Sequence, residues 1–344
     1  MVVDVKLVQD KLYAAISSAR EVQQQPFTLR PSNIGYCPLR LRFDMEAADS
    51  GVGQPRDPKM DWRAFQGVLN EDLFRVLLEM AGAHVVAPPR DSDYWHPQVP
   101  ADPETGFKPH LDALISWPEV GLEGWHVLEL KNLRATEHND FFANGLYPNR
   151  SRWFQAVSYL MLSRLAIKNY SMVELDRFEP GPWTRLHRDE VEAEGIFFFS
   201  VAKDPATATM LMGQRTKTPQ YELNPPAKGL KPEQLAMIEF RKALRMRMEQ
   251  FDQNVDFYFE HVEREDPSVQ DVWRDIVAIK DQVLHSPRPE PLYDITVPDD
   301  QLSAECQWYC PWLEKHREMG LTLVSPTLLG QLEQSVEELQ KEAL

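Results

Sequence analysis

The chain has 344 residues, of which 43% are hydrophobic and 26% charged, a composition that excludes a disordered or fibrous protein and allows a large globular core. Its 53 acidic and 37 basic residues give a formal net charge of −16, which argues against nonspecific coating of nucleic acid. No apolar run approaches the ~20 residues that a membrane span needs, and the opening MVVDVKLVQD is charged where a signal peptide would be apolar. We therefore expect a cytoplasmic protein without a membrane partner.

The first part of the chain predicts helices followed by a pair of strands. Residues 4–25 have the pattern of a polar amphipathic helix, and residues 26–60 that of loop and short helix. Residues 62–81 carry apolar side chains at helical spacing before Gly82, a suitable stop. After a proline-rich connection come two short apolar runs of strand length, joined by a loop with proline and glycine: residues 110–116 and 125–130.

The second part of the chain predicts one more strand among helices. Residues 151–166 return to helical spacing, and residues 195–201 (GIFFFSV) are apolar enough for a strand buried on both faces. Residues 231–263 and 267–285 predict two further helices. This order of elements predicts an α/β core with a helical attachment. Four segments follow: an N-terminal helical segment 1–60, a core 61–230, a helical region 231–320 and a polar helix or tail 321–344.

The two predicted central strands contain charged residues where apolar ones are expected. Asp112 lies within the first strand, and Glu129 and Lys131 interrupt the apolar run of the second. A buried charge is costly unless something binds it, and alternate residues of a strand project from the same face. Antiparallel pairing would bring Asp112, Glu129 and Lys131 together at one end of a sheet. Phosphodiester hydrolysis needs such a set, because carboxylate oxygens hold Mg²⁺ or Mn²⁺ and a cation orients the attacking water.

These charged residues also have a plainer interpretation, a strand edge with a surface Glu–Lys pair. Neighbouring groups extend the candidate site: Glu71 on the preceding helix and the Leu130 carbonyl are further candidate metal ligands. Gln155 and Tyr159 lie one turn apart on the following helix, where they are either structural or close to the phosphate and the general base.

Together these motifs resemble, in their order along the chain, the PD-(D/E)XK nucleases. The similarity is greatest to the RecB-like branch, which includes nucleases of CRISPR spacer acquisition and their phage-encoded relatives. It covers roughly residues 30–318 and rests on five features: the helix with Gly67 and Glu71, the strands HLD (110–112) and ELK (129–131), the helix QAVSY (155–159), and VAKD (201–204) after the late strand.

The resemblance implies a restriction-endonuclease-like core, with a central mixed sheet flanked by helices and an additional helical region. It implies that Asp112, Glu129 and Lys131 form the catalytic set, with Gln155 supporting the phosphate or the lysine. Members of this branch often carry a metal-binding histidine on the first helix, where this chain has Asn70 and Glu71. Glu71 would therefore take the place of that histidine as a different residue type that can also bind a metal. His110, two residues before Asp112, is a second candidate ligand on the same strand face.

The three cysteines are an odd number and too few for a disulfide framework, so they predict a metal site or a reduced compartment. The resemblance implies a [4Fe–4S] cluster held by one cysteine before the core and three near the end. Cys37, Cys306 and Cys310 fit three of these positions, and His316 stands near the fourth. Either His316 completes a site for a cluster or a structural Zn²⁺, or the cluster has been lost. The plainer interpretation is three reduced cysteines that pack as small hydrophobes.

A DNA nuclease needs local positive charge, because phosphate contacts dominate affinity. Cations gather after the second strand and in the stretch beyond the late strand: Arg134, Arg150, Arg152, Lys203, Arg215 and Lys217. Trp153 would stack on an exposed base, and Tyr159 would also contact DNA. Each of these residues also fits an ordinary structural role.

We therefore expect a metal-dependent deoxyribonuclease, an exonuclease or DNA-end processing enzyme of recombination, repair, phage DNA metabolism or CRISPR spacer acquisition. It would act in the cytoplasm of a bacterial cell or a phage-infected host, with DNA and a protein partner or a second copy as partners. One alternative is a noncatalytic DNA-binding or scaffolding protein that retains the nuclease fold. Another is a metal-clamped interaction domain that uses its acidic helices.

Overall fold

The computed structural model describes residues 29–50, 58–89, 106–177, 180–204 and 257–293, with the backbone alone for 58–65. Short pieces elsewhere are also described: residues 6, 10–12, 14, 235, 306, 310–313 and 315. The predicted helix 4–25 and the predicted tail 321–344 lie largely or wholly outside this part of the chain.

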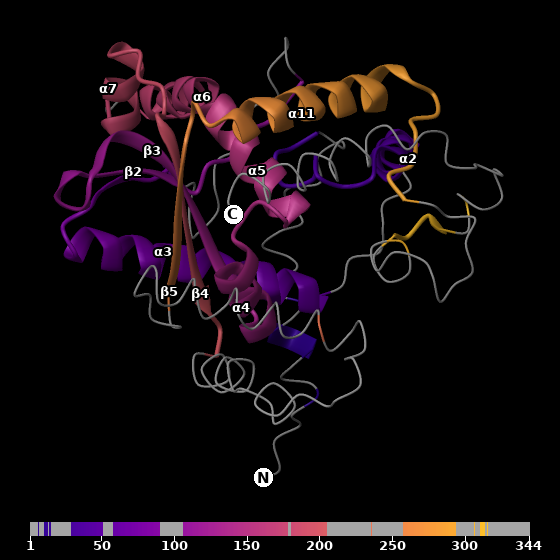
Figure 1. Ribbon diagram of the computed structural model, residues 1–344, viewed down its shortest axis with the longest axis horizontal. Helices are drawn as coiled ribbons and strands as arrows, with labels where there is room; N and C mark the ends of the chain where they lie inside the picture. The colour runs from indigo at the N-terminus through magenta and orange to yellow at the C-terminus, as the bar shows by residue number, and fades with distance from the viewer. Residues whose placement is uncertain are drawn as a thin grey trace.

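A five-stranded mixed sheet forms the centre of the molecule (Figure 1). Its strands follow one another in chain order, β1 (His84–Val86), β2 (Ala113–Trp117), β3 (Leu122–Leu133), β4 (Gly195–Ala202) and β5 (Phe257–Glu263). Neighbouring strands are antiparallel except β3 and β4, which are parallel. The predicted α/β class and the three predicted strands are therefore confirmed, with shifted bounds.

Helices cover both faces of the sheet, because alternate residues of the strands carry apolar side chains to each face. On one face α3 (Pro58–Met80) packs Phe74 and Leu78 against residues of β2, β3 and β4. This helix was predicted, and Gly82 follows it with a φ of +99°. On the other face lie α5 (Arg150–Met161), α6 (Ser163–Asp176) and α11 (Pro267–His285), around the larger core (Figure 1).

The predicted single helix over residues 151–166 is wrong, because the chain breaks into α5 and α6 at Leu162. The guanidinium of Arg264 reaches into this break. Its Nη2 donates hydrogen bonds to the Leu160 carbonyl at 2.7 Å and to Ser163 Oγ at 3.1 Å. Arg264 comes from far along the chain, so local spacing carried no sign of the break.

The predicted helix over residues 231–263 is also wrong at its end. Most of this stretch lies outside the described residues, but Phe257–Glu263 forms β5, antiparallel to β4. The apolar strand β4 needs a neighbour on each edge, and β5 supplies one of them with Tyr258 buried against it. The sheet therefore extends beyond residue 230, where the sequence predicted the end of the core. The predicted helix 267–285 is confirmed as α11.

Three shorter α-helices also lie in the described part of the molecule, α2 (Pro38–Asp49), α4 (Ala135–Asn144) and α7 (Pro182–Arg188), and a 3-10 helix, η1 (Pro118–Val120), joins β2 to β3. α2 packs against α11, α4 lies beside β4 and β5, and α7 packs on α6. Within the described residues, no helix has both the length and the apolar character that crossing a membrane would require.

Candidate active site

Asp112 lies one residue before β2, not inside the strand as predicted. Its carboxylate explains this position, because Oδ2 accepts a hydrogen bond from the backbone N–H of Leu130 on β3 at 2.9 Å. The Asp112 side chain thus accepts a backbone hydrogen bond from β3 at a position where β2 offers no backbone partner. The register, with Ala113 opposite Leu128, then sets Asp112 beside the middle of β3.

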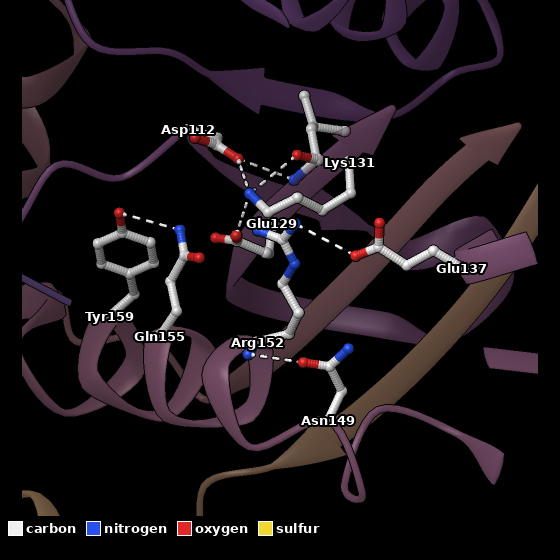
Figure 2. A network of polar contacts seen from close by, with 9 residues as sticks. Asp112, Glu129, Lys131, Glu137, Asn149, Arg152, Gln155 and Tyr159 are labelled. Atoms are coloured by element: carbon white, nitrogen blue, oxygen red, sulfur yellow. Dashed lines mark hydrogen bonds and ion pairs between the residues drawn. The ribbon is translucent and has the colours of Figure 1, made fainter. Parts of the chain in front are cut away.

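Glu129 and Lys131 of β3 project from the same face of the sheet as Asp112, as strand alternation predicted (Figure 2). Lys131 Nζ forms an ion pair with the Glu129 carboxylate, lies 3.7 Å from Asp112 Oδ2 and donates to the Leu130 carbonyl at 3.2 Å. The interpretation as an exposed Glu–Lys pair is wrong, because Glu129 is fully buried.

The burial of Glu129 dominates its electrostatics. Apart from the ion pair with Lys131, no described residue donates a hydrogen bond to either of its oxygens. Burial therefore raises the pKa of Glu129 to about 7, although the charge of Lys131 opposes the shift and that of Asp112 adds to it. Burial by itself lowers the pKa of Lys131, but Glu129 and Asp112 together raise it above its usual value. This arrangement suits a carboxylate that a cation is to bind.

We expect the stability of the metal-free protein to fall as pH rises from 4.5 to about 7. The folded state holds the Glu129 proton in this range whereas the unfolded chain releases it, so stabilisation present below pH 4.5 is lost as pH passes the folded pKa. The loss amounts to roughly 3 kcal/mol. Urea unfolding in EDTA at a series of pH values measures it. Glu129→Gln should lack this decline, and an identical decline in that variant would assign the effect to another group.

Gln155 and Tyr159 lie on α5, beneath the carboxylates (Figure 2). Both are buried, and Gln155 Nε2 donates to Tyr159 Oη at 3.3 Å. Burial raises the pKa of Tyr159 far above its ordinary value, and the nearby charges of Glu129 and Asp112 raise it further. The structure thus brings the predicted Gln–Tyr pair to the carboxylates, with Tyr159 facing them from the interior rather than from the surface.

The other predicted metal ligands are less closely gathered. The Leu130 carbonyl lies at the site, where it accepts from Lys131. His110 precedes β2, with its Nδ1 3.2 Å from Tyr170 Oη on α6. Glu71 lies one turn before Phe74 on α3, the helix of the opposite face. No three His, Cys, Asp or Glu side chains of the described residues form a group ready to hold a metal ion. The ligand roles of Glu71 and His110 stay predictions.

Arg152 is the predicted cation that lies nearest the carboxylates. It extends from α5 towards Glu129 and forms an ion pair with Glu137 of α4 at 3.3 Å (Figure 2). The Asn149 side chain caps the start of this helix by accepting from the Arg152 N–H at 3.2 Å. Arg134 and Lys203 are exposed at the ends of β3 and β4. Arg215 and Lys217 lie outside the described residues.

The prediction that Trp153 stacks on a base is wrong. Its side chain is only 3% exposed and packs against Tyr147 in the main core, with ring centroids 5.9 Å apart. The position follows from the helix itself, because α5 turns Trp153 and Val157 to the core on the same side. Among the predicted DNA contacts on α5, Arg150 and Arg152 keep partial exposure, and the Arg150 guanidinium lies 3.9 Å from the centroid of the Phe154 ring.

Two cations near the site were missed by the sequence analysis. Lys108 is buried, and its backbone N–H donates to the Leu29 carbonyl at 3.4 Å, which sets it beside Arg30. Burial and the charge of Arg30 lower the pKa of Lys108, and burial lowers that of Arg30 while Tyr159 opposes the shift. Both residues lie outside helices and strands, so no periodic pattern in the sequence marked them.

Cys37 lies near Cys306 and Cys310, although it is far from them in sequence. Cys37 is buried at the start of α2, and its Sγ accepts from the Leu292 N–H at 3.3 Å. Burial raises the pKa of Cys310 to about 11, and Cys37 and Cys306 add to the shift, which places both thiols close to it. His316, the predicted fourth ligand, lies outside the described residues.

The segment around Cys310 is attached to α2 by side chains. Trp312 Nε1 donates to Asp44 at 2.7 Å, its ring packs on Phe43, and Lys315 lies over the Phe43 ring. These contacts hold the segment around Cys310 against α2, whereas the predicted metal at the cysteines stays a prediction.

Comparison of the chain with protein-family models, with curated proteins and with solved structures finds no match.

Proposed function

We propose that this chain is a metal-dependent DNA nuclease that hydrolyses phosphodiester bonds at the site formed by Asp112, Glu129 and Lys131. The observation that carries the proposal is the fully buried Glu129 carboxylate, whose oxygens accept no hydrogen bond from the described residues outside its ion pair. Burying a carboxylate in this way costs several kcal/mol unless a cation binds it. A structural ion pair has no need of the second acid, Asp112, at the same place.

The donor set fits a hard divalent cation. Asp112, Glu129 and the Leu130 carbonyl offer oxygen atoms from two adjacent strands, and these would hold Mg²⁺ or Mn²⁺, with Glu71 and His110 as further candidates. When bound, the ion would supply Lewis acidity and a more acidic water.

Lys131 would orient the attacking water and offset negative charge on the phosphate, because its ammonium already lies between both carboxylates. Gln155 would position the phosphate or the lysine from α5, held in place by Tyr159. Arg152, at the rim of the site, would contact the DNA backbone.

The family assignment is part of the same proposal. We infer membership of the PD-(D/E)XK superfamily, in its RecB-like branch. Support comes from the order of elements, with α3 before the antiparallel strands β2 and β3, and α5 before the parallel strand β4. The residues of the strand motifs and of the α5 motif lie together in space, as the family's mechanism requires.

The test is digestion of end-labelled single-stranded, duplex and circular DNA by the full chain with Mg²⁺, with Mn²⁺ and with EDTA. We expect cleavage that depends on the metal, and loss of linear DNA alone would identify an exonuclease. Cleavage of circles would identify an endonuclease. DNA binding without cleavage in either metal would replace the proposal with the noncatalytic scaffold.

For the cysteines we propose a structural [4Fe–4S] cluster or Zn²⁺ held by Cys37, Cys306, Cys310 and His316, which would join the chain ends across α2. Support comes from the packing of the Cys310 segment on α2, the helix that Cys37 precedes. Iron, sulfide and zinc analysis of anaerobically purified protein checks it. Absence of all three elements would leave the cysteines as buried hydrophobes.

A further inference from the structure

We propose that His126 and His261 form a second metal site, for a late first-row divalent ion such as Zn²⁺, on the face of the sheet opposite Glu129 and Lys131. His126 lies on β3 and His261 on β5, with β4 between them. Because His126 is an odd number of residues from both Glu129 and Lys131, strand alternation turns it to the α3 face. The inference does not depend on the proposed nuclease activity.

The two imidazoles meet above a glycine. Gly195 of β4 pairs with His126 on one side and with Glu263 on the other. A Cβ on Gly195 would lie 3.0 Å from both His126 Nδ1 and His261 Nε2, and 2.5 Å from the Val262 carbonyl oxygen. The missing side chain therefore leaves the space in which the two ring nitrogens face each other, at a separation of 3.3 Å.

The hydrogen bond of Nε2, the His126 ring nitrogen that does not face His261, fixes the tautomer of this ring. Nε2 lies 2.7 Å from the Glu123 carbonyl oxygen, which only accepts hydrogen bonds, so Nε2 carries a proton. In the neutral ring Nδ1 then presents a lone pair towards His261. A backbone carbonyl that orients the distal N–H is the usual support for a metal-binding histidine.

The separation of the nitrogens fits shared coordination. Two imidazole nitrogens bound to one tetrahedral Zn²⁺ lie about 3.3 to 3.4 Å apart, from bond lengths of about 2.0 to 2.1 Å. The observed 3.3 Å matches this spacing and is long for an N–H donor, whose usual distance is about 2.9 to 3.0 Å. The rings are inclined at 79°, so they do not stack.

A metal ion can reach this histidine pair from solvent. The imidazole ligands determine which ion binds. His126 is buried, whereas His261 is exposed on β5, at the edge of the described sheet. Glu263 follows two residues later on the same face of β5, where its carboxylate or water would complete the shell. Imidazole favours Zn²⁺, Ni²⁺ and Cu²⁺ over the Mg²⁺ and Mn²⁺ that oxygen ligands hold, so the two sites would take different ions. Ion binding here would tie β5 to β3 across β4.

The test counts Zn²⁺ bound by the full chain after chelator treatment, using isothermal titration and metal analysis, with His261→Gln and His126→Gln as the variants. Each variant should bind one equivalent less than wild type and should lose the rise in Tm that this equivalent produces. His285→Gln removes an exposed histidine of α11 and should match wild type.

Other Zn²⁺ sites cancel in this comparison, because the cysteines and Asp112 are the same in every variant. His261 is exposed, so His261→Gln should fold even if His126→Gln does not. Equal stoichiometry and affinity in wild type, His261→Gln and His285→Gln would overturn the proposal and leave the pair as a hydrogen bond between strands.

Discussion

Asp112→Asn should lower metal-dependent DNA cleavage by about 10³-fold or more. The asparagine keeps an oxygen that can accept from the Leu130 N–H, so the strand contact survives while the negative charge is lost. A metal site supplies several kcal/mol of transition-state stabilisation, and each 1.36 kcal/mol is a factor of ten in rate. Initial rates on labelled duplex DNA, with circular dichroism to confirm folding, give the measurement.

Lys131→Met should cause a loss of similar size at the same site. The variant leaves Glu129 without its ammonium partner, and loss of that charge raises the pKa of the buried carboxyl further, so that it keeps its proton at higher pH. Matched controls remove the same charges from exposed positions of α6, Asp176→Asn and Lys168→Met, and both should retain wild-type rates. Wild-type cleavage by both Asp112→Asn and Lys131→Met would exclude this site as the catalytic centre.

Arg264→Leu should lower the free energy of unfolding by about 3 to 5 kcal/mol, because buried carbonyl and hydroxyl groups lose a charged donor together. Arg264 donates to the Ala193 and Leu160 carbonyls, each at 2.7 Å, and pairs with Glu192 at 3.0 Å. The bond to the Leu160 carbonyl holds the C-terminal end of α5, the helix on which Gln155 lies. Urea unfolding at pH 7 measures the change.

Arg274→Leu is the matched control for this effect, since its side chain is 77% exposed on α11 and pairs only with Asp271 among the described residues. It should change the stability by no more than about 0.5 kcal/mol. Equal stability of Arg264→Leu and wild type would show that the break between α5 and α6 forms without the guanidinium.

The charged residues of the site could be predicted because they violated a strong local rule. Glu129 and Lys131 stood in an apolar strand, and the two-residue repeat of strands placed them on one face with Asp112. The antiparallel pairing followed from the short loop between the strands. The burial of Glu129 could not be predicted from local spacing, because it depends on the packing of α5 against β3.

Other features depended on partners that local spacing does not show. Phe257–Glu263 follows a mixed-charge stretch whose pattern also fits a helix, and its pairing with β4 decided the outcome. Trp153 looked suited to DNA because it follows Arg152, but adjacent residues of a helix face different directions. The glycine beneath His126 and His261 has meaning only once three strands stand side by side.

The Asp112 side chain also helps to fix the register of β2 against β3. Its carboxylate occupies the first unpaired position before β2, and at the other end of the strand a bulge between Ile115 and Trp117 shifts the register before the last pair, Trp117 with Leu122. A slip of β2 by one residue would turn Asp112 to the opposite face and uncouple it from Leu130. Correct pairing of this hairpin and assembly of the charged centre are therefore one event, so a chain with β2 in another register would lack the proposed metal site.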